Sequence, residues 1–494
     1  MKVRDLTPFL SDPLVEGAVE REFTGITHDS RRVTPGMLFV AAPGLQQDGG
    51  AFMASAVERG ASVVLCARDA AAPSRVTRIR VADVREAMAS ASAAFYGYPS
   101  SRLRVIGVTG TNGKTTVAFM VKAMLETSGV RTGLMGTVRY EIGDRVIPAQ
   151  RTTPESVDLQ QMLAQMVRAD CGACVMEVSS HALQQKRVWG IDYDVSIFTN
   201  LTQDHLDYHG GMEDYFAAKR RLFQPDWPVQ KSQTGVINID DSYGERIAAG
   251  NSPAIRMTYG IEKSAELRAT RLELTRECSR FTVETSRHTF ACRLPLIGRH
   301  NVYNALAAIG AGLALEIPIP KIQSALNALP PVPGRLEAIR CTQPFGVFVD
   351  YAHTDDALLN VLKTLREITE GRVLLTFGCG GGRDTSKRAR MGRVAAQLAD
   401  YTLITTDNPR RESPAEIAAQ VESGYRSVRS DSYHIELERR RAIDELVRMA
   451  QPGDTVLIAG KGHETYQEFN DTVVPFDDRV HASETLEQLR QRKR

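Results

Sequence analysis

The amino-acid sequence predicts an α/β protein of three domains, and three observations support that prediction. The chain has 494 residues, whereas a single hydrophobic core stops growing at about 250–300 residues. Short apolar runs of strand length alternate with helical patterns, which is typical of mostly parallel sheets covered by helices on both faces. The hydrophobic content of 43% and the charged content of 24% are ordinary for a globular protein.

The first hundred residues predict a small α/β domain. Residues 37–42 and 61–66 are apolar runs bounded by Gly, Pro and Asp, and such runs indicate buried strands. Residues 98–101 read Tyr-Pro-Ser-Ser, a turn-like segment that precedes the next apolar run. We therefore place the N-terminal domain at residues 1–99.

The middle of the chain predicts a larger domain with a mostly parallel sheet. A strand at residues 103–108 is followed by a glycine-rich turn and by a helix, whose apolar residues recur every three or four positions until Gly129. Further buried strands are predicted at residues 174–178, 195–198 and 235–239. A proline cluster at residues 329–334 cannot continue a helix or a central strand, so we place this domain at residues 100–333.

Residues 334–494 predict a Rossmann-like, doubly wound α/β domain. Its buried parallel strands are predicted at residues 347–350, 373–377, 401–405 and 455–459. Ligands of such open sheets bind at the carboxyl ends of the strands.

The overall charge gives no reason to expect binding to nucleic acid or to a membrane. The formal net charge is +2, from 61 basic and 59 acidic residues, so an anionic ligand has to be met by local basic groups. No apolar run approaches the roughly 20 residues that span a bilayer, and the N-terminus lacks a signal-peptide pattern. We expect a cytoplasmic protein.

The seven cysteines predict neither a disulfide framework nor a metal site. They are scattered and odd in number, which argues against disulfides in a chain of this length. Cys171 and Cys174 form a CxxC pair, but no second pair lies at zinc-site spacing. We interpret all seven as incidental, partly buried thiols.

The strongest local motif is a glycine-rich loop after the strand at residues 103–108. Residues 108–116 read VTGTNGKTT, although Val108 stands where the general phosphate-loop pattern has its first glycine. Backbone N–H groups of such a loop cradle phosphates, Lys114 can reach the β- and γ-oxygens, and the Thr115 hydroxyl can bind Mg²⁺. The alternative is an ordinary glycine-rich turn. The predicted nucleotide contacts are Gly110, Thr111, Asn112, Gly113, Lys114, Thr115 and Thr116.

Residues 109–115, TGTNGKT, resemble the phosphate loop of the Mur ligases and of their relatives, the folylpolyglutamate synthases. The resemblance continues in residues 176–181 (MEVSSH) and 199–210 (TNLTQDHLDYHG), which each follow a predicted strand. It implies that the nucleotide is ATP and that Glu177 and His205 belong to a Mg²⁺ site. A lone histidine is more often structural, so the role of His205 depends on the resemblance.

Residues 215–219 (YFAAK) match the helix on which Mur ligases carry a carbamylated lysine. The resemblance implies that Lys219 is that lysine and, as a carbamate, holds a second Mg²⁺ near the transferring phosphate. The residues alone would indicate a solvated helix face. The implied catalytic set is Lys114, Glu177, His205 and Lys219, and the implied Mg²⁺ ligands are Thr115, Glu177, His205 and carbamylated Lys219.

Three further segments resemble parts of Mur ligases that contact ATP. They are GRHNVYN at residues 298–304, GRLE at residues 334–337 and VDYAH at residues 349–353. The resemblance implies ATP contacts from Asn301, Arg335 and Asp350. Asp355 stands where relatives often carry proline.

The N-terminal domain resembles the UDP-sugar-binding domain of the MurE and MurF types of this family, which folylpolyglutamate synthases lack. The match lies in residues 29–36 (DSRRVTPG) and in the loop at residues 44–49. In the central domain, the TTP at residues 152–154 resembles the MurE type. An acidic substrate with a diphosphate and a D-Glu carboxylate needs arginine and amide donors. The implied contacts to this UDP-muramoyl dipeptide are His28, Ser30, Leu45, Gln46, Gln47, Arg151, Thr152, Thr153, Ser179, Gln185 and Arg187.

The implied amino-acid selector is DNPR at residues 407–410. In the family, DNPR marks ligases that add diaminopimelate, while lysine-adding relatives lack the arginine. Diaminopimelate differs from lysine by a second carboxylate, which a guanidinium can pair bidentately and which lysine leaves unmatched. Without the resemblance, these segments would be glycine-rich turns of an ordinary sheet. The implied diaminopimelate contacts are Arg383, Asp407, Asn408, Pro409, Arg410, Gly460 and Glu464.

The resemblance implies an ATP- and Mg²⁺-dependent ligase that adds meso-diaminopimelate to UDP-N-acetylmuramoyl-L-Ala-D-Glu through an acyl phosphate. We expect a monomer that acts on small molecules, and domain closure, because the ATP contacts come from two domains. The alternatives are a lysine-adding ligase, ligases that add D-alanyl-D-alanine or extend folate, and a phosphate-loop switch protein without ligase activity. The last alternative leaves Lys219, Arg410 and Glu464 without roles.

Overall fold

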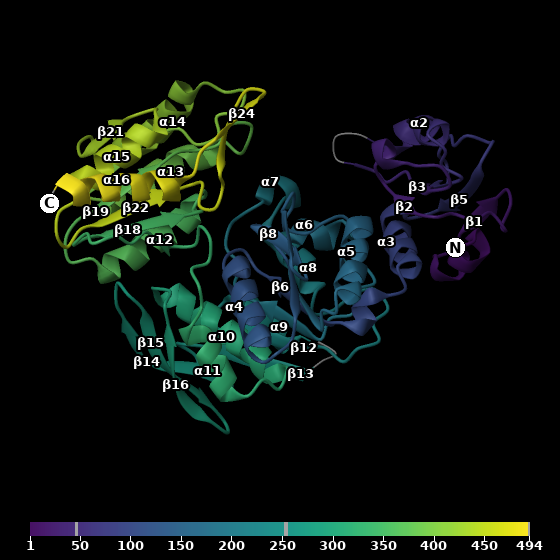
Figure 1. Cartoon of the computed structure of the whole chain (residues 1–494), viewed down its shortest axis with the longest axis horizontal. Helices are drawn as coiled ribbons and strands as arrows, with labels where there is room; N and C mark the ends of the chain where they lie inside the picture. The colour runs from purple at the N-terminus through teal and green to yellow at the C-terminus, as the bar shows by residue number, and fades with distance from the viewer. Residues whose placement is uncertain (45–47, 251–254, 493–494) are drawn as a thin grey trace.

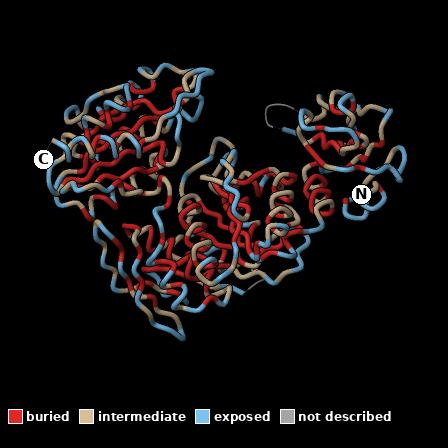
Figure 2. Tube along the Cα trace, viewed as in Figure 1, coloured by how far each residue is buried: buried red, intermediate tan, exposed pale blue. Residues whose placement is uncertain are grey.

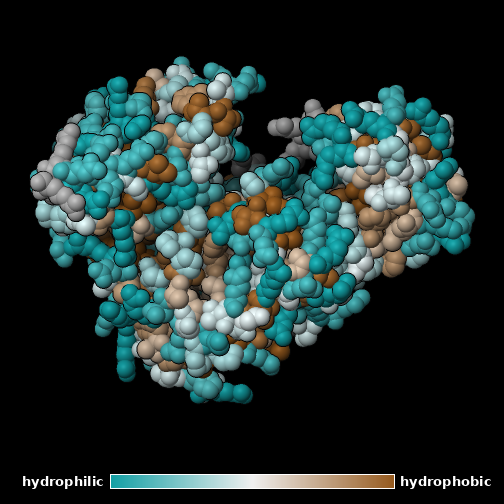
Figure 3. Space-filling model, in the orientation of Figure 1, coloured by the Kyte–Doolittle hydropathy of each residue, from teal (hydrophilic) through white to brown (hydrophobic). Residues whose placement is uncertain are grey.

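The computed structural model describes residues 1–44, 48–250 and 255–492, which form three lobes that follow one another along the chain (Figure 1). Each lobe is built on one large sheet, of five, eleven and six strands in chain order. We propose the ranges 1–99, 100–333 and 334–494 as the domains, because each contains one of these sheets. The N-terminal and C-terminal lobes lie at opposite ends of the central lobe, and the molecular surface is hollowed between them (Figure 3).

The N-terminal sheet has the order β1-β5-β4-β3-β2, in which β1 is antiparallel to β5 and the other pairs are parallel. Two of its strands confirm the predictions for residues 37–42 and 61–66, namely β3 (Leu38–Val40) and β4 (Val63–Ala67). The remaining elements are β1 (Leu14–Glu16), β2 (Ile26–Thr27), β5 (Thr77–Val81), α1 (Val3–Leu6), α2 (Met53–Glu58), α3 (Val84–Phe95) and the 3-10 helices η1 (Thr7–Phe9), η2 (Ser30–Arg32), η3 (Gly49–Phe52) and η4 (Pro99–Arg102).

The central sheet positions the glycine-rich loop. Strand β6 (Arg104–Thr109) lies between β10 (Ala173–Glu177) and β11 (Val195–Phe198) and is parallel to both. The carboxyl ends of these three strands therefore meet at one edge of the sheet. The full order is β16-β15-β14-β13-β12-β11-β6-β10-β7-β8-β9, with parallel pairing from β14 to β7 and antiparallel hairpins at both ends.

The strands predicted in the central domain are confirmed as β6, β10, β11 and β12 (Thr234–Asn238). The predicted helix is α4 (Lys114–Thr127), which ends before Gly129. The other elements are β7 (Thr132–Met135), β8 (Arg139–Ile142), β9 (Arg145–Pro148), β13 (Ile255–Gly260), β14 (Leu267–Leu274), β15 (Ser279–Thr285), β16 (Thr289–Leu294), α5 (Ser156–Arg168), α6 (Ser180–Gln184), α7 (Leu206–His209), α8 (Met212–Arg220), α9 (Ser242–Ala249), α10 (Arg299–Ala314) and α11 (Ile319–Asn327).

The C-terminal sheet has the order β17-β18-β22-β19-β20-β21, and only the pairing of β17 with β18 is antiparallel within it. The four predicted strands are confirmed as β18 (Gly346–Asp350), β19 (Val373–Phe377), β20 (Tyr401–Ile404) and β22 (Thr455–Ala459). A separate hairpin joins β23 (Tyr466–Phe469) and β24 (Thr472–Pro475). The other elements are β17 (Glu337–Ala338), β21 (Tyr433–Ile435), α12 (Asp355–Ile368), α13 (Ser386–Leu398), α14 (Pro414–Arg426), α15 (Arg439–Met449) and α16 (Asp478–Arg492).

The inner strands of the three large sheets pack against apolar clusters on both faces, since successive side chains of a strand point to opposite sides. Along β6, Val105 belongs to one apolar cluster, whereas Ile106 and Val108 belong to another. Along β19, Leu374 and Leu375 are divided in the same way. Figure 2 shows the buried residues concentrated inside each of the three lobes.

All seven cysteines are free in the structure, and six of them are buried while Cys341 is partly exposed. Over residues 1–44, 48–250 and 255–492, no helix combines the length and the apolar character that crossing a bilayer requires.

Candidate active site

The glycine-rich loop joins β6 to α4 at the middle of the central sheet. Two of its glycines have positive φ angles, 148° at Gly110 and 88° at Gly113. A Cβ atom at Gly110 would lie 1.9 Å from Thr199 Oγ1, and one at Gly113 would lie 2.3 Å from Asn304 Oδ1. A side chain at either position would displace a neighbouring loop or helix, so the close packing requires glycine.

Lys114 begins α4, and its side chain folds back over the loop. Its Nζ donates hydrogen bonds to the carbonyl oxygens of Gly110 (2.9 Å) and Thr111 (2.8 Å). Burial lowers the pKa of Lys114, and the carboxylates of Glu177 and Asp204 oppose that shift. The ammonium group therefore donates to neutral acceptors. A phosphate oxygen that took the place of one of them would form a stronger, charge-assisted hydrogen bond.

Glu177 ends β10 and is 1% exposed. It accepts hydrogen bonds from Thr115 Oγ1 at 3.0 Å and from the backbone N–H and the hydroxyl of Thr137 at 2.8 and 3.0 Å. Gly136 permits this arrangement, because a Cβ atom there would lie 2.3 Å from Glu177 Oε1. A carboxylate and a hydroxyl side by side are the hard oxygen ligands that Mg²⁺ prefers, so Thr115 and Glu177 fit this ion.

Lys219 lies on the inner side of α8 and is 1% exposed, so the alternative of a solvated helix face is wrong. Its Nζ donates to the Gly110 carbonyl oxygen at 2.8 Å and lies 4.6 Å from the centroid of the Tyr215 ring. Burial and then the Lys114 ammonium hold the pKa of Lys219 well below its ordinary value. The neutral amine is the form that reacts with CO₂, so this environment suits the expected carbamate.

His205 precedes α7 in a left-handed conformation, with a φ of 54°. Its ring packs edge-on against His181 and Tyr215, with ring centroids 4.9 and 6.3 Å away, and its Nε2 lies 3.5 Å from Asp204 Oδ2. Tyr215 thus contacts both His205 and Lys219. In the part of the chain that the structure describes, no three His, Cys, Asp or Glu side chains form a metal cluster. A Mg²⁺ site here needs the Thr115 hydroxyl or a Lys219 carbamate in addition.

The three expected ATP contacts from the second half of the chain differ in their distance from the loop. Arg335 reaches it directly, because its Nη2 donates to Thr115 Oγ1 at 3.1 Å. Asn301 accepts a hydrogen bond from Asn304 at 3.0 Å, and Asn304 in turn packs against the loop. Asp350 accepts from two backbone N–H groups, and burial raises its pKa. These hydrogen bonds hold the backbone of Leu336, the residue after Arg335, at the start of the C-terminal domain.

Four of the expected contacts to the muramoyl dipeptide form one hydrogen-bonded group. Thr153 Oγ1 donates to the carbonyl oxygen of Glu177 at 2.8 Å and accepts from the backbone N–H of Ser179 at 3.1 Å. Arg187 donates to the carbonyl oxygen of Thr153 at 3.0 Å and to Gln185 Oε1 at 2.7 Å. These side chains therefore surround the carboxyl end of β10, next to the glycine-rich loop.

Arg151 and Thr152 extend this group. The hydroxyls of Thr152 and Thr137 lie 3.1 Å apart, so Thr152 joins the contacts around Glu177. Arg151 pairs with Glu155 Oε1 at 2.9 Å, and the same oxygen lies 3.1 Å from Arg187 Nε. Two cationic side chains are thereby held together by one carboxylate.

His28 and Ser30 lie in the N-terminal domain, between β2 and the end of η2. His28 Nδ1 is buried and has no hydrogen-bond partner among the described residues, so it is available to a ligand. The expected contacts Leu45, Gln46 and Gln47 lie outside the described residues. An ion pair of 2.8 Å between Arg32 and Asp158 joins this domain to α5.

The expected diaminopimelate contacts gather at the carboxyl ends of β20 and β22. Asn408 Nδ2 donates to Glu464 Oε2 at 2.9 Å, and Lys461 Nζ donates to the same oxygen at 3.1 Å. Burial raises the pKa of Glu464. Gly460 has a φ of 110°, and a Cβ atom there would lie 2.6 Å from Asp407 Oδ2. The two segments expected to form the pocket are therefore in direct contact.

Arg410 lies between a glycine-rich loop and the β23–β24 hairpin. Its Nη1 donates to the carbonyl oxygen of Gly381 at 2.7 Å, and its Nε donates to Glu468 Oε2 at 2.9 Å. A Cβ atom at Gly381 would lie 1.9 Å from the carbonyl oxygen of Pro409, so this loop also packs on the DNPR segment. Arg383 is exposed on the same loop.

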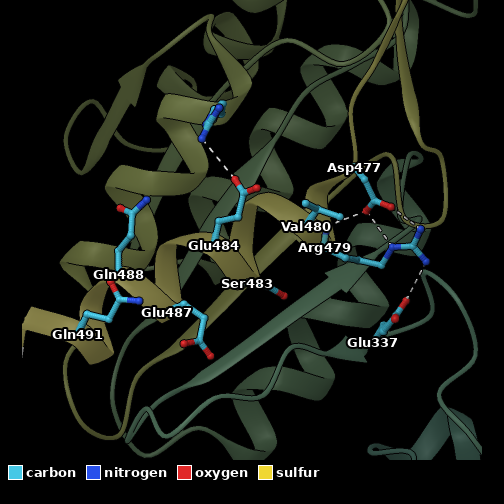
Figure 4. Close-up of a pocket in the computed structure, with 10 residues that line it drawn as sticks. Glu337, Asp477, Arg479, Val480, Ser483, Glu484, Glu487, Gln488 and Gln491 are labelled. Atoms are coloured by element: carbon cyan, nitrogen blue, oxygen red, sulfur yellow. Dashed lines mark hydrogen bonds and ion pairs between the residues drawn. The ribbon is translucent and has the colours of Figure 1, made fainter.

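An open cavity of about 770 Å³ lies away from these residues, along α16 (Figure 4). Several of its charged side chains pair with one another, as Arg479 does with Asp477 and Glu337, and as Arg440 does with Glu484. None of the expected site residues lines it. The cavity therefore has no part in the candidate site.

Three residues of the site were missed by the sequence reasoning. Thr137 binds Glu177 but lies outside every quoted motif. Lys461 stands between the expected contacts Gly460 and Glu464 and is 0% exposed, so its place in the sequence was a usable signal. Asp356 accepts hydrogen bonds from Asn112 and Thr202, at 2.9 and 2.8 Å. No local sequence pattern around Asp356 indicated its contact with the glycine-rich loop.

The unusual Asp355 leaves the turn intact. It is the first residue of α12, and Thr354 caps the helix by accepting from the backbone N–H of Ala357 at 3.2 Å. Proline is well accepted at the first position of a helix. Aspartate and proline therefore suit the same backbone here.

Comparison with known proteins covers most of the chain. Residues 22–96 match the Mur ligase family, catalytic domain, residues 108–312 match the Mur ligase middle domain, and residues 334–462 match the Mur ligase, glutamate ligase domain. A relative from Syntrophomonas wolfei, named UDP-N-acetylmuramoyl-L-alanyl-D-glutamate--2,6-diaminopimelate ligase, is 44% identical over 98% of this chain and 99% of its own length.

Two solved structures have the same architecture. A structure of a UDP-N-acetylmuramoyl-L-alanyl-D-glutamate--2,6-diaminopimelate ligase superposes with a TM-score of 0.71 at 32% identity and covers 99% of each chain. MurF ligase from Thermotoga maritima in complex with ADP, at 16% identity, has a TM-score of 0.63 and covers 95% of this chain and 98% of that chain. The second likeness concerns the fold alone. The three matched domains and the full-length relatives show that this chain belongs to the Mur ligase family.

Proposed function

We propose that this protein is the ATP-dependent ligase that joins meso-diaminopimelate to the D-Glu γ-carboxyl of UDP-N-acetylmuramoyl-L-Ala-D-Glu, in peptidoglycan precursor synthesis. The relatives at 44% and 32% identity, both named as 2,6-diaminopimelate ligases, support this function over nearly the whole chain.

The observation that carries the proposal is the arrangement of charges at the C-terminal strand ends. Arg410 and Glu464 are connected through Asn408, which donates to Glu464 and accepts from the backbone N–H of Glu468, the partner of Arg410. One end of diaminopimelate carries a carboxylate and an ammonium together. A guanidinium suits the carboxylate and a carboxylate suits the ammonium, whereas the corresponding end of lysine carries only the ammonium.

The glycine-rich loop and its surroundings are proposed to bind ATP. Lys114 and Arg335 lie where they can meet phosphate oxygens, since both contact residues of the loop. Thr115, Glu177, His205 and carbamylated Lys219 are proposed to hold Mg²⁺, which when bound neutralises charge on the transferring phosphate. The carboxyl end of β10, with Ser179 and Arg187, is proposed to place the D-Glu carboxylate beside the loop.

The reaction follows from that placement. The D-Glu γ-carboxylate attacks the γ-phosphorus of ATP, so that ADP leaves and an acyl phosphate forms. The diaminopimelate amine then attacks the acyl carbon, the nitrogen loses a proton and phosphate leaves, so that the amide bond is formed. Lys114 stabilises the negative charge that develops on the phosphoryl oxygens, which is the main requirement of phosphoryl transfer. We further propose that the protein acts as a monomer in the cytoplasm on these small molecules.

The test is product formation with two amino acids. Purified protein is incubated with ATP, Mg²⁺ and UDP-N-acetylmuramoyl-L-Ala-D-Glu, with either meso-diaminopimelate or L-lysine, and product mass and phosphate release are measured. Tripeptide formed with diaminopimelate and not with lysine is the expected result. Preference for lysine would overturn the role of Arg410, and ATP hydrolysis without a peptide product would overturn the ligase function.

A further inference from the structure

The arginine expected to recognise diaminopimelate is itself held by a carboxylate, that of Glu468. The Arg410 Nε and Glu468 Oε2 atoms lie 2.9 Å apart, and the two side chains are 27% and 32% exposed. The pair is thus partly shielded from water. This strengthens it relative to a fully exposed ion pair such as that between Arg411 and Asp471, whose side chains are 82% and 85% exposed.

Backbone hydrogen bonds also hold Arg410 and Glu468 next to each other. The backbone N–H of Arg410 donates to the carbonyl oxygen of Glu468 at 3.0 Å, and that of Asn470 donates to the carbonyl oxygen of Arg410 at 2.7 Å. The backbone N–H of Glu468 donates to Asn408 Oδ1 at 3.1 Å. Glu468 therefore lies beside the DNPR segment because β23 runs along it, and not through a chance contact of two long side chains.

The hydrogen bonds leave part of the Arg410 guanidinium available. A guanidinium has five N–H groups, and the hydrogen bonds to Glu468 and Gly381 use Nε and one N–H of Nη1. Among the described residues, Nη2 has no hydrogen-bond partner. The end of the guanidinium formed by Nη1 and Nη2 can still receive a carboxylate. Glu468 is thus bonded through Nε and leaves the Nη2 group to a ligand.

We propose that Glu468 is a positioning residue that determines specificity for diaminopimelate by orienting Arg410. This inference rests on the proposed function. Arg410 has a long side chain, and without Glu468 the hydrogen bond to the Gly381 carbonyl oxygen alone would order its guanidinium before it meets the ligand. With Glu468 in place that ordering is already complete, and binding of the second carboxylate does not have to supply it.

The experiment compares the variants Glu468→Gln and Glu468→Asp with the full-length wild type, by steady-state kinetics at varied meso-diaminopimelate. Glu468→Gln is expected to raise the KM for diaminopimelate on the order of fivefold, in line with the strength of a partly shielded ion pair. The kcat and the KM values for ATP and the UDP-substrate are expected to change little. Glu468→Asp keeps the charge and should recover part of the loss.

A matched control and a double-mutant cycle separate positioning from a general structural role. Asp471→Asn removes the neighbouring, exposed pair with Arg411 at the tip of the same hairpin, and should leave all three KM values unchanged. In an Arg410→Ala background, Glu468→Gln should cause no further rise in the KM for diaminopimelate, because Glu468 acts by orienting the Arg410 side chain.

The possible failures are distinguishable. A wild-type protein that forms no tripeptide with diaminopimelate would remove the proposed function itself. If the wild type is active, an unchanged or lowered KM in Glu468→Gln overturns the inference, the lowered value indicating that Glu468 competes with the ligand. An equal rise of all three KM values, or a full effect in the Arg410→Ala background, also overturns it.

Discussion

At the scale of single residues, the site is notable for two lysines that share one acceptor. The Nζ atoms of Lys114 and Lys219 lie 2.9 and 2.8 Å from the carbonyl oxygen of Gly110. Burial lowers the pKa of both lysines, and the nearby Lys114 ammonium lowers the pKa of Lys219 further. The Glu177 and Asp204 carboxylates oppose the lowering of the Lys114 pKa, whereas Asp204 alone opposes it for Lys219. The pKa of the lysine expected to carry a carbamate is thus held well below its ordinary value, which favours the neutral amine.

The first prediction concerns Lys219→Arg. Arginine stays protonated and cannot react with CO₂, so the variant should lose kcat by a factor on the order of a hundred or more. Wild-type activity should fall when CO₂ and bicarbonate are removed and return when bicarbonate is added, as measured by phosphate release. Because the neutral amine is needed, this recovery should be weaker at lower pH.

The control is Lys263→Arg, a change of the same type at a side chain that is 44% exposed and pairs with Glu245. It should keep full activity and show the same response to bicarbonate as the wild type. Full activity of Lys219→Arg would contradict the assignment of the carbamate to this residue.

At the scale of secondary structure, a buried ion pair joins the first turns of α15 and α16. Arg439 Nε and Nη2 donate to Asp478 Oδ1 and Oδ2, both at 2.7 Å, and both side chains are 0% exposed. Arg439 also donates to the carbonyl oxygens of Ala459 and Thr406, which lie at the ends of β22 and β20. The pair therefore supports the strand ends from which the proposed diaminopimelate pocket is built.

The second prediction concerns Asp478→Asn. This change leaves the buried Arg439 cation without its counter-charge, which should lower the free energy of unfolding by about 3–5 kcal/mol. The loss is measured from urea unfolding of the full chain. The control Glu484→Gln removes the half-exposed pair with Arg440, 3.3 Å long, and should cost less than about 1 kcal/mol. Equal losses in the two variants would contradict the role given to the buried pair.

At the scale of the whole molecule, the C-terminal lobe reaches the glycine-rich loop of the central lobe through two side chains. Asp356 accepts from Asn112 and Thr202, and Arg335 donates to Thr115. Both contacts involve residues on or next to the proposed ATP site. The arrangement of the two lobes and the binding of ATP should therefore be coupled, since ATP phosphates need the same loop.

The third prediction concerns Asp356→Ala. The change removes two charge-assisted hydrogen bonds between the lobes, so the nucleotide-free protein should open and its radius of gyration in small-angle X-ray scattering should increase. Asp355→Ala is the matched control, because Asp355 pairs at 3.0 Å with Arg390 inside the C-terminal lobe. It should leave the radius of gyration unchanged. An equal increase in the radius of gyration of both variants, or no increase in either, would contradict the coupling between the lobes and the ATP site.

The sequence by itself determined the class of fold and the order of the motifs. Residues 195–198 were predicted as a strand and are β11 with the same bounds, because a buried strand is specified by a local run of apolar residues. Strand–loop–helix chemistry likewise predicted the phosphate loop. The resemblance to Mur ligases named the candidate site residues, and their roles stay predictions.

Only the tertiary structure decided which side chains meet. A helix such as α8 can bury or expose a given face, and its packing beneath the glycine-rich loop is what buries Lys219. Asp356 lies 244 residues from Asn112 and Glu468 lies 58 residues from Arg410 along the chain. Local sequence patterns specify secondary structure, but contacts over such separations depend on how whole elements pack, which no local pattern records.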